Sequence, residues 1–196
     1  MNSERLFSEV IRTISKWSAR GEKVLSTGVR LVCPTPHVAP EAWLHVLFPP
    51  LAPEKIAETE RKLGALLPED FKKFLMQANG LMLFSYRIDV FGVRETWVRT
   101  GDAAWQPHDL VNHNYETGRP AGSPAEVIFF GSVERSEWCF FEFQEGKYRV
   151  GKTSREIFRP SAYWENFASW LLSEISAMEK RCNSDGVCQE PDKTRS

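Results

Sequence analysis

Residues 56–80, IAETERKLGALLPEDFKKFLMQANG, predict two short helices joined by a tight turn. Four residues of the first half share one face of a helix with about 3.6 residues per turn: Ile56, Thr59, Glu60 and Leu63. Gly64 follows them, and helices commonly end where a glycine can adopt a positive φ. The first helix is therefore expected to end at Leu63.

A second helix is predicted to begin at Pro68. Proline has a preset φ and no N–H to satisfy, while Glu69 and Asp70 place negative charge beside the positive end of the helix dipole. The apolar stripe of this helix comprises four residues: Phe71, Phe74, Leu75 and Ala78. Asn79 and Gly80 then predict a left-handed helix end. Together the two segments predict a compact helical hairpin.

The order of motifs in this stretch resembles the signature of the SUKH superfamily. The chain reads I-x-x-x-E-x-x-L-G, then L-P-x-D-F-x-x-F-L, then N-G. The superfamily includes fungal cell-wall-assembly regulators and bacterial immunity proteins. The later segments also follow the family order: a polar loop at 109–114, an apolar run at 127–130, a strand at 138–143 and a closing helix. The resemblance extends over residues 51–178.

One turn departs from the family pattern. Members often carry a Gly-Asp pair just before the strand that here contains Trp138, whereas this chain has Arg135, Ser136 and Glu137 at that place. The resemblance implies a non-enzymatic binding module. For a bacterial member it implies a cytoplasmic immunity protein that binds and blocks a cognate toxin, often a nuclease. For a fungal member it implies a regulatory scaffold.

Composition and charge limit the classes of function. The chain has 196 residues, of which 42% are hydrophobic, enough for one sizeable core with a small appendage. Lys and Arg number 25 and Asp and Glu number 26, so the formal net charge is −1. The whole molecule therefore lacks the field that would hold nucleic acid or an anionic membrane. The charged first residues resemble neither a signal peptide nor a membrane span, so a cytoplasmic protein is expected.

The first 50 residues are expected to form a helical extension and a proline-rich connector. An amphipathic helix is predicted from one apolar face: Leu6, Val10, Ile14 and Trp17. This helix either covers a flank of the main domain or acts as a partner-binding or dimerising helix. Residues 28–40 carry three prolines and predict an extended connector. A short apolar run at 43–48 follows it, and Pro49 and Pro50 mark the candidate domain boundary. The main domain is expected over 51–180 and a flexible polar tail over 181–196.

Beyond residue 80 the period changes from helical to alternating. Residues 86–90 alternate apolar and polar, which predicts a strand with Asp89 on its wet face. Gly92 is expected to turn the chain into a partner strand containing residues 96–98. Residues 127–130 predict a fully buried strand.

The C-terminal third predicts a hairpin followed by a helix. Residues 138–143 and 148–150 form the strands of the hairpin, and the helix is expected to begin near Ser161, after Pro160. Its buried stripe comprises Trp164, Phe167, Ala168, Leu171, Leu172, Ile175 and Met178. Trp170 lies on the flank of that stripe. The fold class is therefore α+β, a largely antiparallel sheet flanked by the N-terminal helical hairpin and a C-terminal helix.

The four cysteines lack the C-x-x-C spacing of a metal or redox site. Cys33 stands alone, and Cys139 lies among aromatic residues of a predicted strand, where a small buried hydrophobe fits. Reduced thiols are expected in the cytoplasm. In an oxidising compartment Cys182 and Cys188 would instead close a small loop.

Residues 146–153, GKYRVGKT, match the phosphate-binding pattern G-x-x-x-x-G-K-[ST]. Such a loop opens a long helix, with further parallel strands downstream. Here Tyr148 and Val150 alternate like a strand, and Pro160 interrupts the segment downstream of the match. We therefore interpret the match as a hairpin strand and expect Lys152 to bind no nucleotide.

Residues 108–114, HDLVNHN, crowd two imidazoles, a carboxylate and amides into one loop. These groups suit a metal site, so a metal-dependent nuclease or hydrolase that uses His108 and His113 is the alternative function. The spacing of five residues fixes no common geometry for the two rings. A loop held by hydrogen bonds of Asx turns explains the same composition.

The aromatic surplus points to a contact surface. Residues 94–114 carry tryptophans and charged residues with no periodic reason for burial, which is typical of protein-contact hot spots. The predicted contact set is Trp97, Arg99, Asp102, Trp105, His113 and Glu137, the last where the family's acidic residue would lie. No spacing predicts a catalytic triad or dyad, and no cofactor or metal is expected.

The leading hypothesis is a module that binds a protein partner, a cognate toxin in the immunity case, without direct contact to nucleic acid or membrane. The near-neutral net charge counts against a tight electrostatic plug for a basic nuclease, which would favour an acidic inhibitor. The partner's identity and the oligomeric state are left open by the sequence.

Overall fold

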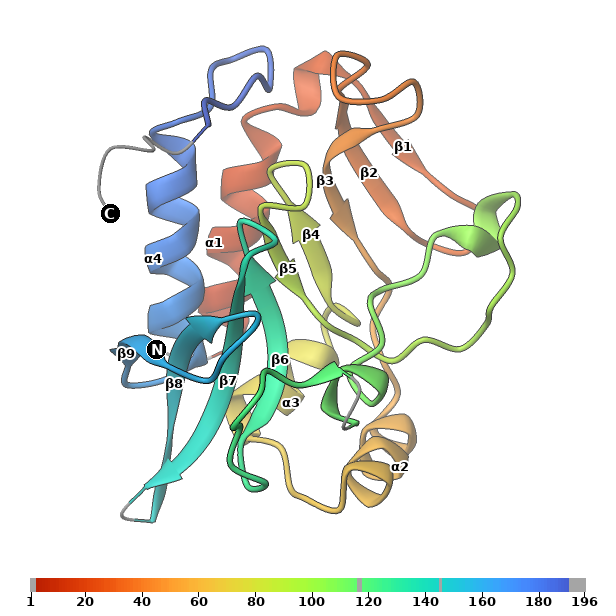
Figure 1. The fold of residues 1–196 in the computed structure, drawn as a ribbon. Coiled ribbons are helices and arrows are strands. Elements are labelled where there is room, and N and C mark those ends of the chain that lie inside the picture. Colours follow the sequence, from red (N-terminus) through yellow and green to blue (C-terminus); the bar gives the residue numbers. More distant parts are fainter. Residues whose placement is uncertain (1–2, 116–117, 145, 191–196) are drawn as a thin grey trace.

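The computed structural model describes residues 3–115, 118–144 and 146–190, and within them the chain is α+β, as expected (Figure 1). Nine strands form one antiparallel sheet in which each strand pairs with the next along the sequence. The strands are β1 (Glu22–Val24), β2 (Arg30–Pro34), β3 (Trp43–Leu47), β4 (Leu81–Leu83), β5 (Ile88–Val90), β6 (Ile128–Val133), β7 (Glu137–Gln144), β8 (Lys147–Ser154) and β9 (Pro160–Trp164).

Four α-helices accompany the sheet in this part of the chain: α1 (Ser3–Ser15), α2 (Pro53–Leu63), α3 (Glu69–Leu75) and α4 (Phe167–Glu179). Short 3₁₀ turns occur at η1 (Ser18–Arg20), η2 (Asp102–Ala104) and η3 (Asn112–Asn114). Helices α1 and α4 lie side by side against one face of the sheet (Figure 1). None of the described helices is both long enough and apolar enough to span a bilayer.

The helical hairpin is confirmed, with one correction at its end. Helix α2 ends at Leu63, and Gly64 adopts the left-handed conformation with φ 67°. Helix α3 ends at Leu75, so the left-handed end expected at residues 79 and 80 is wrong. Gly80 does have φ 83°, but it turns the chain into β4. A Cβ at Gly80 would lie 2.5 Å from the carbonyl oxygen of Val90, so the turn has room only for glycine.

The N-terminal segment joins the main fold more fully than expected. The apolar face of α1 is buried in the main core, as the interpretation of a covered flank requires. The extended connector expected over 28–40 is wrong, because β2 lies within it and pairs with β1 and β3. Its strand signal is hidden because Leu31 and Val32 are both buried, so no wet face alternates with a dry one. The prolines cluster at the end of β2 and in the following turn.

Two later expectations are also corrected. No strand occurs at residues 96–98, which belong to the long segment between β5 and β6. The last helix begins at Phe167 rather than near Ser161, because the residues after Pro160 form β9 against β8. Asn166 caps the helix, and its side chain and that of Ser169 each bond the other's backbone N–H.

Because α4 begins later than expected, a different tryptophan is buried. Trp164 leaves the helix for β9 and is only partly buried, whereas Trp170, expected on the flank, is completely buried against Phe130. Phe71, Phe141 and other aromatic residues surround this pair on the helix side of the sheet.

The other face of the sheet carries one row of residues in direct cross-strand register: Leu31, Val46, Met82, Asp89, Ser132, Trp138 and Thr153. Residues paired in this way point to the same side of an antiparallel sheet. We call this side, opposite α1, α3 and α4, the second face. The expected wet position of Asp89 is therefore wrong, since its side chain is only 4% exposed and lies on this face beneath the long β5–β6 segment.

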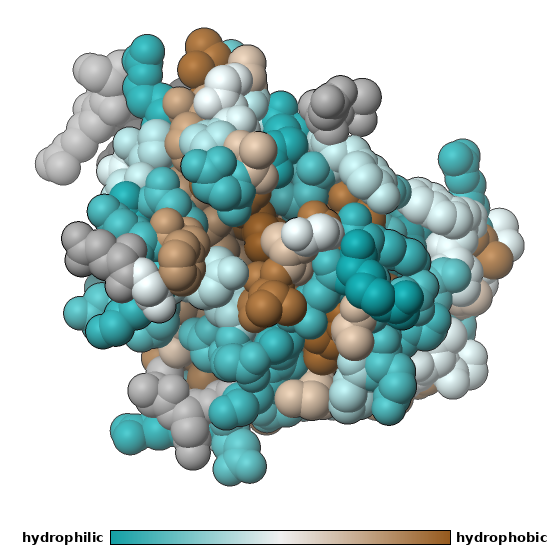
Figure 2. Space-filling model, turned by 90° about the horizontal axis from the view of Figure 1, so that it is seen from below, coloured by the Kyte–Doolittle hydropathy of each residue, from teal (hydrophilic) through white to brown (hydrophobic). Residues whose placement is uncertain are grey.

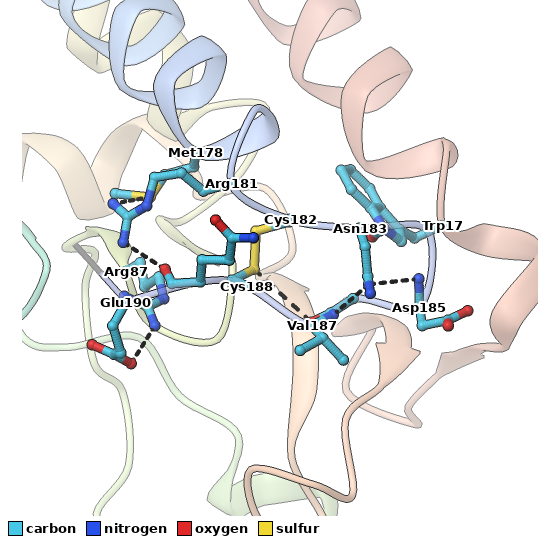
Figure 3. The surroundings of a disulfide bond; sticks show 12 residues. Trp17, Arg87, Met178, Arg181, Cys182, Asn183, Asp185, Val187, Cys188 and Glu190 are labelled. Atoms are coloured by element: carbon cyan, nitrogen blue, oxygen red, sulfur yellow. Dashed lines mark hydrogen bonds and ion pairs between the residues drawn. A yellow bond between two sulfur atoms is a disulfide. The ribbon is translucent and has the colours of Figure 1, made fainter. Parts of the chain in front are cut away.

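Residues 181–190 fold back over the end of the molecule, so the flexible tail predicted there is wrong for this portion (Figure 3). A disulfide joins Cys182 and Cys188, which also corrects the expectation of reduced thiols at these positions. The indole N–H of Trp17 donates to the Asn183 carbonyl over 2.9 Å. At the other end Arg87 forms an ion pair of 2.7 Å with Glu190. Residues 191–196 of the predicted tail lie outside the described residues.

Seen from below, the surface mixes polar area with apolar side chains that gather near the middle of the view (Figure 2). The β7–β8 hairpin and the loop after α2 lie at this end of the molecule (Figure 1). Phe143 and Leu66 are exposed there, and the Tyr148 hydroxyl links the two segments by donating to the Leu66 carbonyl over 3.0 Å. This hydrogen bond links the hairpin to the loop after α2.

Candidate binding pocket

A pocket of about 350 Å³ opens on the second face over β5, β6 and β7. Its walls combine three aromatic side chains, Tyr86, Phe91 and Trp138, with a set of ionisable groups. Asp89 and Ser132 form its floor, since the two residues are direct cross-strand partners. Aromatic walls with a few convergent polar groups are typical of binding sites.

The β5–β6 segment delivers both histidines to the pocket. Its anchor is Gly92, whose N–H donates to the His108 carbonyl over 2.9 Å and whose carbonyl accepts from Leu110 over 2.8 Å. A Cβ at Gly92 would lie 2.2 Å from the Asn79 carbonyl oxygen. Only glycine allows the segment to approach the α3–β4 turn this closely. The hydrogen bonds of Gly92 then fix the position of His108 beside the end of β5.

Asp89 and His108 form a short hydrogen bond between Oδ2 and Nδ1. The bond to Asp89 raises the pKa of His108, although burial opposes the shift. The second carboxylate oxygen, Asp89 Oδ1, is buried and has no hydrogen-bond partner among the described residues. The floor of the pocket thus carries one satisfied and one unsatisfied acceptor.

His113 has a different environment from His108. Its Nδ1 lies 2.7 Å from the Asp109 carbonyl, so in the neutral ring Nδ1 carries the proton and Nε2 is an acceptor. Its ring stacks on Phe91 with 4.2 Å between centroids. Burial lowers the pKa of His113, which favours the neutral ring. The two histidines therefore bring opposite protonation preferences to one pocket, with 5.8 Å between their ring centroids.

Side-chain hydrogen bonds hold this loop in the way the composition predicts. Asp109 Oδ1 accepts from the backbone N–H groups of Val111 and Asn112 over 2.8 and 3.0 Å, which confirms the Asx interpretation. Asn114 binds the backbone of Phe129 on β6 twice, accepting over 2.8 Å and donating over 2.7 Å. The Asn114 side-chain amide therefore makes the two backbone hydrogen bonds that a neighbouring strand would make at this position of β6.

Two arginines stand at the rim. The Arg155 guanidinium carbon lies 5.7 Å from the centroid of Trp138, and that of Arg135 lies 5.7 Å from the centroid of Tyr86. Within the described part of the chain, neither has a carboxylate within 4.0 Å. Their hydrogen bonds go to carbonyl oxygens, over 3.1 Å from Arg135 to Ser85 and 3.5 Å from Arg155 to Arg135.

The predicted contact residues are spread over several places. Trp97 is 63% exposed, with the Arg94 guanidinium 4.3 Å above its ring, and Arg99 is exposed beside it. Asp102 fastens the segment to the β1–β2 turn by accepting from the N–H and the hydroxyl of Ser26, both over 2.8 Å. Trp105 packs partly buried against the small apolar cluster of the second face.

His113 alone of the predicted contact set lines the pocket, and Glu137 lies elsewhere. Glu137 neighbours Trp138 in the strand and so points to the helix side. There it pairs with Lys152 over 2.9 Å, and Lys152 also approaches Glu174 of α4 at 3.7 Å. The segment Lys147–Ser154 is strand β8, which confirms the strand interpretation of the phosphate-loop pattern.

Sequence reasoning missed Asp89, Tyr86 and Arg155 as site residues. Asp89 has one usable signal, since a carboxylate between Ile88 and Val90 interrupts an apolar strand. Its partner His108 is 19 residues away, and no local pattern links the two. The aspartate and the two histidines share a pocket, yet no cluster of three or more His, Cys, Asp or Glu suited to a metal ion occurs in residues 3–115, 118–144 and 146–190.

The fold and pocket define an α+β protein with helices on one sheet face and a mixed aromatic and polar pocket on the other. The sequence profile of the SMI1 / KNR4 family (SUKH-1) matches residues 50–173, well over half of the chain. The protein therefore belongs to this family, which confirms the SUKH resemblance. Helix α1 and strands β1 to β3 precede the matched residues.

A shorter likeness concerns a bacterial protein. A segment of 35 residues, 18% of the chain, is 46% identical to "Uncharacterized protein YnaB" of Bacillus subtilis (strain 168). The matched segment spans 24% of that relative's length. This short likeness carries no function with it.

Proposed function

We propose that the protein is a non-enzymatic binding module that neutralises a cognate toxin. The observation that carries the proposal is the pairing of a pocket on the second face with an adjoining segment, residues 93–115, that displays exposed aromatic and charged side chains. Membership of the SMI1 / KNR4 family supports it, since the SUKH superfamily includes immunity proteins. The toxin would cover the second face and this segment.

The helix side of the sheet supports the same choice of surface. Helices α1, α3 and α4 direct their apolar residues into the main core, so the helix side has little apolar stripe left for a partner. In contrast, Trp97 is exposed and its ring contacts the Arg94 guanidinium, and exposed tryptophan beside arginine is typical of contact hot spots. Trp97, Arg99, Asp102, Trp105 and His113 remain the proposed contact set. Glu137 is left out because it points to the helix side of the sheet, where it pairs with Lys152.

The first experiment is affinity capture from the native host, followed by a growth assay. Tagged protein is used to capture its partner, which is then expressed alone and together with this protein. The proposal requires that the partner arrests growth alone and that co-expression restores growth. A partner that causes no arrest, or an arrest that co-expression leaves unchanged, contradicts toxin neutralisation. Capture of a harmless protein would favour a regulatory scaffold instead.

The contact surface is tested with matched variants. Trp97→Ala should weaken binding of the captured partner by about 2 kcal/mol if the indole is a hot spot. Phe143→Ala removes a similarly exposed aromatic ring from the β7–β8 hairpin and should leave the affinity unchanged. Equal effects of the two variants, measured by calorimetry with both proteins folded, would contradict this surface.

The metal-dependent alternative has its own test. Elemental analysis of purified wild-type protein and of His108→Ala with His113→Ala measures bound metal. The binding module predicts no stoichiometric metal in either protein. A metal present in the wild type and lost in the variant would favour a nuclease or hydrolase that uses these histidines.

A further inference from the structure

The charged groups of the pocket do not balance. Arg135 and Arg155 stand at its rim without a carboxylate within 4.0 Å in the described part of the chain. Six other described arginines have one: Arg12, Arg20, Arg30, Arg87, Arg149 and Arg181. Arginines elsewhere in the described chain also lack one, but only Arg135 and Arg155 line this pocket. The pocket's single carboxylate, Asp89, is already bound to His108. A protein with almost no net charge therefore concentrates positive charge here.

The floor of the pocket does not compensate this positive charge. Asp89 Oδ2 is bonded to His108, and Asp89 Oδ1 is buried within the protein, so an occupant of the open pocket does not reach it. The occupant must therefore itself supply the anionic group that the rim arginines lack.

Size and charge narrow the choice. About 350 Å³ accommodates one amino-acid side chain with its backbone amide rather than a large cofactor. A phosphate would place nearly two negative charges beside Asp89, whereas a carboxylate brings one. Guanidinium groups bind carboxylates in a planar two-point arrangement, and the aromatic walls exclude water from such a pair.

We propose that this pocket binds the carboxylate of an aspartate or glutamate side chain of the protein partner. The proposal rests on the proposed function and specifies what the partner presents to it. Arg135 and Arg155 bind the carboxylate from the rim. His108 adds a donor at Nε2 when it is protonated, because its Nδ1 is used by Asp89. The partner's contact region is thus acidic at this point, in contrast to the basic active site expected of a nuclease toxin.

The direct test uses a blocked amino acid and needs no partner. N-acetyl-L-aspartate N-methylamide is titrated into ¹⁵N-labelled wild-type protein, and the Trp138 indole signal is followed by NMR, assigned with Trp138→Phe. A saturable shift is expected. N-acetyl-L-asparagine N-methylamide has the same shape without the charge and should cause at most a tenth of that shift. Acetate, which lacks the backbone groups that would pack on the aromatic walls, should bind more weakly than the blocked aspartate.

The arginines are tested with a charge-matched control. Arg135→Gln with Arg155→Gln should weaken binding of the blocked aspartate at least tenfold. Arg61→Gln with Arg159→Gln removes the same charge from exposed sites outside the pocket and should change the affinity less than twofold. All four positions are exposed, and circular dichroism checks that both variants fold. Equal weakening by both pairs would show only a general charge effect and would overturn the proposal.

Two further outcomes are informative. Free L-aspartate binding tenfold more tightly than the blocked form would assign the pocket to a small metabolite and overturn the partner side chain. Equal shifts from the aspartate and asparagine probes would overturn carboxylate recognition. Either failure leaves the growth assay untouched, and a failed growth assay leaves the probe titration to stand or fall by itself.

Discussion

His45 is a buried histidine with neither ring nitrogen bonded in the described part of the chain. It is completely buried on β3, between Trp17 and Phe84, at centroid distances of 5.2 and 4.9 Å. Burial lowers its pKa from the ordinary 6.5 to about 3. The ring therefore packs as an apolar group while it is neutral. It lowers the stability of the folded state only at low pH.

The stability of the protein should fall as the pH falls below about 6.5. The unfolded chain protonates His45 near its ordinary pKa, whereas the folded chain resists protonation down to about 3, so acid favours unfolding. Between pH 7 and pH 5 this difference amounts to about 2 kcal/mol of unfolding free energy. His45→Leu should remove that portion of the pH dependence, measured by urea denaturation at several pH values.

The pKa of His108 shifts in the opposite direction, so the pH dependence of the wild type alone does not isolate the effect of His45. The raised pKa of His108 adds stability at low pH that is lost as the pH rises through that value. Only the difference between wild type and His45→Leu isolates the buried ring. Identical pH slopes for the two proteins would contradict the assignment of His45 as a neutral, buried group.

Among the structural elements, the two glycines of the helical hairpin differ in their surroundings. A Cβ at Gly64 would meet nothing within 4 Å, whereas one at Gly80 would meet backbone atoms of β5 and its following residues. Both glycines have positive φ, so the two sites differ in the neighbouring backbone and not in their own conformation.

Gly64→Asn should therefore be tolerated and Gly80→Asn should not. Asparagine visits the left-handed region readily, so its cost at Gly64 should stay below about 1 kcal/mol. At Gly80 the clash with the Val90 carbonyl adds backbone displacement, and the variant should lose at least about 2 kcal/mol more than Gly64→Asn. Thermal unfolding followed by circular dichroism measures both. Similar losses would mean that the turn before β4 can open.

The sequence predicts an element well when the residues that mark its ends are close together in the chain. Gly64 and Pro68 mark a helix end and a helix start within a few residues, so the hairpin is predictable. Strand β2 is buried on both faces and loses the alternation that identifies strands. The true start of α4 rests on Asn166, a cap signal that competes with Pro160 further upstream.

The pocket is predictable only in part for the same reason. His108, His113 and Asp109 attract attention because they are close in sequence. Asp89 is read as a surface residue, because its burial depends on the segment that returns over it 19 residues later.

At the scale of the whole molecule, the disulfide closes a short loop, residues 182–188, that packs against the region after α1 (Figure 3). Trp17 donates to the Asn183 carbonyl of this loop, and Arg20 forms an exposed ion pair with Asp185 that adds little to stability. Just outside the loop, Arg181 pairs with Glu134, and Glu190 pairs with Arg87 of the β4–β5 turn. The disulfide and the packing of the loop therefore restrain this segment together.

Cys182→Ser with Cys188→Ser should lower the unfolding free energy by about 2 kcal/mol, because a loop of this length gains little more entropy when opened. Reduction with dithiothreitol should lower the melting temperature of the wild type to that of the variant and leave the variant unchanged, since Cys33 and Cys139 are unpaired and buried. A melting temperature insensitive to both changes would mean that packing alone holds the segment.

Helix α4 supplies the side chains that cover the aromatic core on the helix side of the sheet. Phe130 and Phe141 pack beneath Phe167 and Trp170, which belong to the last helix. During synthesis, the first helix and most of the sheet leave the ribosome while these aromatic rings still lack their cover. A chain that stops before residue 167 therefore displays the apolar surface that chaperones and proteases recognise, so the cell can distinguish truncated copies from finished ones by surface chemistry alone.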